Sequence, residues 1–185
     1  MNSEKLGEQT LRSDRIYNGK VINLRRDMVK LPIGKTAIRE VVEHQGGVSI
    51  VAMPDDHTIV LVRQFRRPSM KMLLELPAGS LEEGESPEEC ASRELVEETG
   101  YRADSLVKIQ KFFLAPGYST EVMHIFMATG LSETDRRLDE EEDIEVIKVE
   151  FGEAVQMVMR GEIEDAKSIC GILRADIMMR EEFRS

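Results

Sequence analysis

The 185-residue chain has no tryptophan, two cysteines and three histidines. Cys90 and Cys170 alone do not make a disulfide framework, so we expect reduced thiols in a cytoplasmic protein. His44, His57 and His124 are too scattered along the sequence for a histidine metal triad or a phosphohistidine mechanism. The sequence therefore argues against a small disulfide-stapled domain and against histidine chemistry.

Long apolar runs and an excess of positive charge are also missing. No run approaches the ~18 apolar residues of a membrane span, and the polar N-terminus lacks the apolar core of a signal peptide. A net charge of −10 argues against nucleic acids and anionic membranes as partners. With 41% hydrophobic residues the chain can build a core, and its length fits one domain with or without a small appendage.

Acidic residues are abundant, and they gather in residues 79–101, GSLEEGESPEECASRELVEETGY. This stretch holds eight acidic residues against one basic residue, Arg93. Ser86, followed by a proline and by Glu89 three positions later, predicts the capped start of a helix. Gly100 predicts its end. Most of the chain's net charge therefore lies on one short helix and the loop before it.

Three carboxylates of this predicted helix, those of Glu94, Glu97 and Glu98, fall within an arc of about 100°. Like charges at these spacings repel, and only Arg93 offers relief within the helix. One interpretation is an ordinary solvated acidic face. The other is a metal site, because a hard divalent cation such as Mg²⁺ prefers oxygen ligands and turns the repulsion into coordination.

The spacing within this stretch resembles the Nudix box, GX5EX7REUXEEXGU, in which U is a bulky apolar residue. Every fixed position matches, from Gly79 and Glu85 to the run between Arg93 and Tyr101. The resemblance implies a pyrophosphohydrolase that splits a nucleoside diphosphate linked to another moiety. It also implies two or three Mg²⁺ ions per site, with Mn²⁺ as a possible substitute.

The order of predicted elements suits an α/β protein with a mixed sheet, which agrees with the α/β/α sandwich that the Nudix resemblance implies. We expect an N-terminal antiparallel β segment over 1–43 and a Nudix hydrolase domain over 44–185. The segment would hold a loose arm to about residue 12, a hairpin with an Asn18-Gly19 turn whose second strand is 20–24, and a strand at 36–43. The other predicted strands are 48–53, 58–67, 72–76, 106–113, 121–127 and 144–149, and the later helices are 151–160 and 165–180.

The Nudix resemblance also assigns roles around the box. It implies that metal ligands are the carboxylates of Glu94, Glu97 and Glu98 and the backbone carbonyl of Ala78, and that Glu97 and Glu98 count among the catalytic residues. The supporting positions that it implies are Gly79, Glu85 and Arg93, with Arg93 holding the glutamates by ion pairing.

A general base is still missing, because glutamates that hold metal ions are poor proton acceptors. The acidic run at 139–143 is a natural source, although a solvated loop is a competing interpretation. In similar ADP-ribose pyrophosphatases, a loop glutamate before an apolar-Glu-Val strand serves as base or metal-water ligand. By that resemblance Glu142 is the first choice, with Glu140 or Glu141 as the alternatives.

Cationic residues outside the box are expected to bind the substrate. Arg63 and Arg66 end a predicted strand, and clustered guanidiniums suit bidentate contacts with phosphate. Surface ion pairing is the alternative for each. Arg39 is a further candidate, and Tyr118 is the aromatic residue that we retain as a substrate contact. In the related family, the arginine at the position of Arg66 contacts substrate.

Other stretches resemble the bacterial ADP-ribose pyrophosphatases, namely VRQFR, ELPAG, Pro116 fifteen residues after Tyr101, and IEDAK at 163–167. This resemblance implies Mg²⁺-dependent hydrolysis of ADP-ribose to AMP and ribose 5-phosphate by a homodimer with the N-terminal strands in its interface. Two alternatives remain open. One is another nucleoside diphosphate sugar as substrate, such as ADP-glucose or GDP-mannose, and the other is a non-catalytic nucleotide-sugar-binding module.

Overall fold

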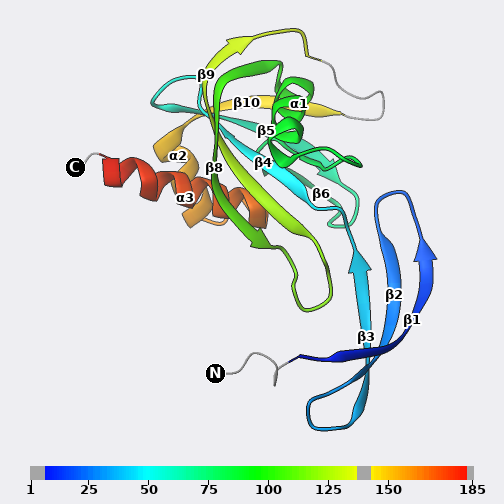
Figure 1. Ribbon diagram of the computed structural model, residues 1–185. Coiled ribbons are helices and arrows are strands. Elements are labelled where there is room, and N and C mark those ends of the chain that lie inside the picture. Colours follow the sequence, from blue (N-terminus) through cyan, green and yellow to red (C-terminus); the bar gives the residue numbers. More distant parts are fainter. Residues whose placement is uncertain (1–6, 137–142, 183–185) are drawn as a thin grey trace. The chain divides into compact units, whose positions relative to one another are not determined.

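The computed structural model describes residues 7–136 and 143–182, and it divides into two compact units (Figure 1). Of the described residues, 7–45 and 113–121 form unit 1, and 46–112, 122–136 and 143–182 form unit 2. In the described part of the chain, no helix has both the length and the apolar character that crossing a membrane requires.

Unit 1 is an antiparallel sheet with the strand order β1-β2-β3. The predicted loose arm is wrong from Gln9 onward, because β2 continues to Lys30 and gives Gln9 a pairing partner there. The predicted second strand is also displaced. Gly19 donates to the carbonyl of Ile22 at 3.1 Å, so a loop of four residues separates the strands. The strands are β1 (Gln9–Asn18), β2 (Asn23–Lys30) and β3 (Thr36–Glu43).

The second segment of unit 1 runs beside the end of β3. Val42 donates to the carbonyl of Tyr118 at 2.8 Å, and Thr120 donates to the carbonyl of Val42 at 2.9 Å. The carbonyl of Ala115 accepts from the amides of Tyr118 and Ser119, which closes the turn predicted around Pro116. Backbone hydrogen bonds therefore attach the Tyr118 turn to the N-terminal sheet.

Unit 2 is built on a mixed seven-stranded sheet. Its main order is β10-β5-β4-β9-β8, with β6 paired to β5 and β7 paired to β4. The β4–β9 pair is parallel, whereas β5 pairs antiparallel with β4, β6 and β10. The strands are β4 (Gly47–Ala52), β5 (Thr58–Arg66), β6 (Lys71–Glu75), β7 (Ala78–Ser80), β8 (Tyr101–Phe113), β9 (Val122–Glu133) and β10 (Ile144–Glu150), and the helices are α1 (Pro87–Thr99), α2 (Phe151–Met159) and α3 (Ala166–Glu182).

Apolar residues on both faces of this sheet create two cores. On β4, Ile50 packs with Leu95 of α1, whereas its neighbour Val51 packs with Ile172 of α3. Because successive side chains of a strand point to opposite faces, α1 covers one face and the pair α2 and α3 covers the other (Figure 1). The α/β/α sandwich with a mixed sheet and an added antiparallel N-terminal sheet is thus confirmed.

Helix α1 begins and ends where the sequence predicted. The Ser86 hydroxyl accepts from the Glu89 amide at 3.2 Å, and the Glu89 carboxylate accepts from the Ser86 amide at 2.9 Å. Gly100 ends the helix with a φ of 73°, a left-handed conformation that favours glycine. Strand β8 follows directly, five residues before its predicted start at 106, and the short strand β7 was not predicted at all.

Candidate active site

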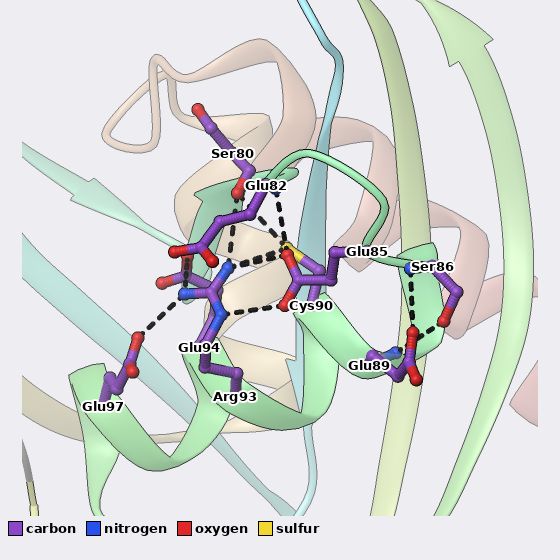
Figure 2. Close-up of polar contacts among 9 residues, drawn as sticks. All are labelled: Ser80, Glu82, Glu85, Ser86, Glu89, Cys90, Arg93, Glu94 and Glu97. Atoms are coloured by element: carbon purple, nitrogen blue, oxygen red, sulfur yellow. Dashed lines mark hydrogen bonds and ion pairs between the residues drawn. The ribbon is translucent and has the colours of Figure 1, made fainter.

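The centre of the acidic stretch is Arg93, whose guanidinium contacts three carboxylates (Figure 2). Its Nε and Nη2 donate to the two oxygens of Glu85 at 2.9 and 3.0 Å. Its Nη1 donates to Glu94 at 2.7 Å and to Glu97 at 2.9 Å. The backbone carbonyl of Ser80 also accepts from Nη2 at 3.3 Å. Arg93 therefore relieves the repulsion between glutamates that the sequence places close together.

These ion pairs shift the protonation equilibria of the cluster. The hydrogen bonds from Arg93 lower the pKa of Glu85 to about 2 and raise the pKa of Arg93 itself. Burial raises the pKa of the nearby Cys90 thiol to about 12, and the charge of Glu85 acts in the same direction. Because only a thiolate is a strong nucleophile, Cys90 is an inert packing residue here.

Strand β7 lies against two glutamates of α1, Glu94 and Glu98. A side chain at Gly79 would place its Cβ 1.8 Å from Oε1 of Glu94, so only glycine leaves room for that carboxylate. The Glu98 carboxylate is 3% exposed and accepts a hydrogen bond from the amide of Ala78 at 2.8 Å. The backbone ahead of the acidic loop is thereby held against the helix that carries the expected metal ligands.

The residues expected to hold a divalent ion supply oxygen donors only, the donor type that Mg²⁺ and Mn²⁺ prefer. Gly79, with no side chain, leaves the space in which Glu94 sits. In the described conformation, Glu94 and Glu97 contact Arg93, and Glu98 contacts Ala78. Across residues 7–136 and 143–182, no three acidic, histidine or cysteine side chains converge as a metal-binding group. The donor chemistry fits the ion, whereas these carboxylates are directed at Arg93 and a backbone amide.

The arginines predicted to bind substrate all form ion pairs. Arg63 donates to Glu145 at 2.5 and 2.9 Å, and both side chains are about half exposed. Arg66 forms a fork with the buried Glu75, with both bonds at 2.8 Å. The alternative to substrate binding, an ion pair, is thus present for each arginine. Each ion pair uses only some of the N–H donors of the guanidinium.

Two other predicted substrate contacts come together in unit 1. Arg39 and Tyr118 both line a cavity of about 520 Å³, together with Phe113 and Pro116. Tyr118 is 61% exposed, and Arg39 forms an ion pair with Glu8 at its rim. A cavity with an exposed aromatic ring and a guanidinium has the chemistry to bind a planar base.

The predicted base, Glu142, and its alternatives Glu140 and Glu141 lie outside the described residues. The structure shows the chain on both sides of that segment. Nη2 of Arg136 donates to the carbonyl of Ile144 at 2.7 Å, which joins the end of one flank to the start of β10. Sequence reasoning did not identify Arg136.

Sequence reasoning also missed a group of buried charges in unit 2. Glu75 and Lys167 are buried and paired at 2.5 Å, and Asp165 lies 2.9 Å from Lys167. The signal was present, since Glu75 interrupts an apolar strand and a buried charge needs a partner. Both ELPAG and IEDAK, which contain these residues, were used only as marks of resemblance.

Comparison with protein-family models gives two matches. Residues 36–170 match the model described as the NUDIX domain. Residues 8–42 match the model described as the nucleoside diphosphate sugar hydrolase N-terminal domain. The chain belongs to the Nudix hydrolase family. The resemblance seen in the acidic stretch is thereby confirmed, and hydrolases of this family generally use a divalent metal ion.

Among Nudix relatives, an ADP-ribose pyrophosphatase of Bacillus subtilis is 44% identical over 171 residues, which is 91% of this chain and 92% of the relative. A GDP-mannose pyrophosphatase of Yersinia enterocolitica is 39% identical over 150 residues, covering 76% of this chain and 78% of the relative. A crystal structure of an ADP compounds hydrolase superposes with a TM-score of 0.85 over 97% of this chain and 98% of the other, at 22% identity. That likeness concerns the fold.

The lowered pKa of Glu85 predicts an acid sensitivity. Because the pKa falls from 4.5 to about 2 on folding, the stabilisation is complete above pH 4.5 and is lost as the pH approaches 2. We expect the free energy of unfolding of the Glu85→Gln variant to change less over this window than that of the wild type. Urea unfolding at a series of pH values, without added divalent ions, measures this. Glu88→Gln, on the exposed side of α1, should follow the wild type, and identical pH dependence in all three proteins would contradict the prediction.

Proposed function

We propose that this Nudix protein hydrolyses the pyrophosphate bond of ADP-ribose to AMP and ribose 5-phosphate. The observation that carries the proposal is the arrangement at β7, where Glu94 occupies the space above Gly79 and Glu98 binds the amide of Ala78. Two of the box carboxylates thus lie against the backbone segment that carries the Ala78 carbonyl. The relative from Bacillus subtilis, similar along nearly the whole chain, supports the substrate.

The metal ligands that we propose are the carboxylates of Glu94, Glu97 and Glu98 and the carbonyl of Ala78. Bound Mg²⁺, or Mn²⁺ in its place, two or three ions per site, would neutralise phosphate oxygens and lower the pKa of a bound water. Arg93 contacts both Glu94 and Glu97, and its bonds to Glu85 keep the guanidinium in place. Arg93 thus offsets the repulsion between these neighbouring glutamates.

Hydrolysis itself needs a water whose oxygen bonds to one phosphorus of the bridge while the bridging oxygen leaves with the other phosphate. We propose that Glu142 accepts the proton of that water. The proposal is supported by the position of Glu142 two residues before β10 and by Arg136, which fixes the start of that strand at Ile144.

The substrate contacts that we propose are Arg66 and Arg63 for the phosphates and Arg39 and Tyr118 for the base. Arg66 and Arg63 lie at the end of β5, and each keeps donors beyond its ion pair. Arg39 and Tyr118 line the same cavity in unit 1. A second candidate substrate class is another nucleoside diphosphate sugar, which the GDP-mannose pyrophosphatase relative supports.

We also propose a homodimer that uses the sheet of unit 1. Met28 and Ile38 lie opposite each other on β2 and β3 and are 42% and 51% exposed. Leu11 and Ile16 of β1 are also about half exposed. Exposed apolar side chains concentrated on one small sheet are typical of an interface.

A substrate panel tests the function directly. We expect release of AMP from ADP-ribose with Mg²⁺, faster than hydrolysis of ADP-glucose, GDP-mannose, NADH or a diadenosine polyphosphate, and we expect chelation to abolish it. Anion-exchange chromatography of the products measures each rate. Faster hydrolysis of another compound would change the proposed substrate, and turnover of none would favour a binding module.

Replacing Glu98 by glutamine tests the metal ligands. The amide oxygen can still accept from Ala78, so the fold should persist, but kcat should fall by about 100-fold or more because a charged ligand is lost. Steady-state kinetics and a Mn²⁺ titration followed by electron paramagnetic resonance measure turnover and metal affinity separately. The exposed Glu88→Gln is the matched control. Wild-type kinetics in Glu98→Gln would remove Glu98 from the site.

Replacing Glu142 by glutamine tests the base. We expect kcat to fall by at least about 100-fold, because general base catalysis contributes roughly that much or more, with little change in substrate affinity. Pre-steady-state and steady-state kinetics measure the two effects. A change confined to affinity would argue against proton transfer by Glu142.

Sedimentation velocity tests the dimer. The wild type should sediment as a dimer, and Met28→Asp or Ile38→Asp should shift it toward the monomer, since a buried unpaired carboxylate is unfavourable. Ile177→Asp changes an apolar residue of unit 2 that is 49% exposed and serves as the control. A monomeric wild type, or a dimer unaffected by both substitutions in unit 1, would refute the proposed interface.

A further inference from the structure

A second charged group lies in unit 2, apart from the carboxylates around Arg93. Its central member is Glu75, the last residue of β6, whose side chain is 1% exposed. The side chains of Lys167 and Asp165 are 10% and 18% exposed, and that of Arg66 is 40% exposed. Buried charges are retained at a cost in desolvation unless partners compensate them. The arrangement of these partners therefore needs an explanation beyond stability.

Both cations of this group contact the Glu75 carboxylate. Its Oε1 accepts from Nε of Arg66 at 2.8 Å, and its Oε2 accepts from Nη2 of the same guanidinium at 2.8 Å. Nζ of Lys167 donates to the same Oε2 at 2.5 Å and pairs with Asp165 at 2.9 Å. Arg66 is thus held by one edge, and its Nη1 takes no part in the fork with Glu75.

The charges balance within the group, since Arg66 and Lys167 face Glu75 and Asp165. Burial raises the pKa of Glu75, but the hydrogen bonds from Arg66 and the charge of Lys167 outweigh it, and the net pKa lies below its usual value. The Glu75 hydrogen bonds raise the pKa of Arg66, and the charge of Glu98 contributes in the same direction. Both acids therefore favour the charged form of Arg66.

Helix α3 holds the strand that carries Glu75. The amide of Leu76 donates to the hydroxyl of Ser168 at 2.7 Å, and both residues are fully buried. The next carbonyl, that of Pro77, accepts from Ile50 at 2.8 Å. Lys167 and Ser168, neighbours in α3, thus fix the side chain of Glu75 and the backbone that follows it.

We propose that Glu75 and Lys167 are positioning residues that hold the guanidinium of Arg66 by its Nε edge and direct the remaining edge at a phosphate oxygen of the nucleoside diphosphate. The inference rests on the proposed function. Arginine has a long flexible side chain, and fixing it before the substrate arrives removes an ordering cost from binding. Lys167 acts on the substrate only through Glu75 and Arg66, from a helix that covers the opposite face of the sheet from α1.

The deciding variant is Lys167→Met, which keeps the two partners of the Arg66–Glu75 pair and removes one of the two cations that contact Oε2 of Glu75. We expect KM for ADP-ribose to rise about tenfold and kcat to change less than about twofold, because a binding contact is loosened and the reacting groups are not. Lys167→Arg should restore most of the affinity. Lys71→Met removes another lysine of unit 2, from an exposed ion pair with Glu164, and should leave KM unchanged.

A double-mutant cycle separates positioning from stability. In an Arg66→Met background, Lys167→Met should raise KM no further, since its effect passes through Arg66. Melting temperatures by circular dichroism report any loss of stability independently. Calorimetry with a methylene-bridged analogue of ADP-ribose gives substrate affinity without turnover and should show the same tenfold loss.

The outcomes are distinguishable. If the wild type hydrolyses no diphosphate of the panel, the proposed function fails and this inference fails with it. If the wild type is active and Lys167→Met lowers only the melting temperature, the pair is structural and the inference alone is overturned. An equal rise in KM in the presence and absence of Arg66 would also overturn it, as would failure of Lys167→Arg to restore affinity.

Discussion

The structure of the site depends on the repulsion between carboxylates that share one helix face, and on the single guanidinium that opposes it. Arg93 contacts Glu85, Glu94 and Glu97, so the acidic loop and the helix are joined at one point. Without that cation, the residues that suit a divalent ion would separate. The same contacts lower the pKa of Glu85 and keep it charged. The guanidinium of Arg93 thus supplies the positive charge that opposes the repulsion among these glutamates.

The backbone of β7 provides the second constraint. Glu94 lies where a side chain at Gly79 would be, and Glu98 binds the amide of Ala78. Further back along the same segment, Leu76 bonds to α3 and Pro77 bonds to β4. Residues 76–79 are thus held by contacts with three elements, α1, α3 and β4. Such a segment moves little, which suits a backbone carbonyl that is proposed to bind a metal ion.

The two charged groups of unit 2 differ in what they can do. The group around Arg93 is partly exposed and holds three carboxylates against one guanidinium, so its net charge is negative and suits a cation. The group around Glu75 is electrically balanced and more deeply buried, so it suits the orientation of a side chain. Arg66 pairs with Glu75, and the charge of Glu98 also raises the pKa of Arg66. In our proposal, the glutamates of the acidic stretch bind the metal ions, whereas the group around Glu75 orients the guanidinium of Arg66.

Local signals in the sequence determined the capped helix α1, most strand positions, the α/β class and the Nudix box, because caps, glycines and alternation act over a few residues. They did not determine that β1 starts at Gln9 or that Ala78–Ser80 is a strand, since both depend on partners far along the chain. The box glutamates were predictable as a set. Their partners were decided by the tertiary structure, which brings Glu75 to Lys167 across 92 positions and encloses both. A charged side chain is buried and held in one orientation only when tertiary packing removes the water around it. The spacing of residues in the sequence does not predict that packing.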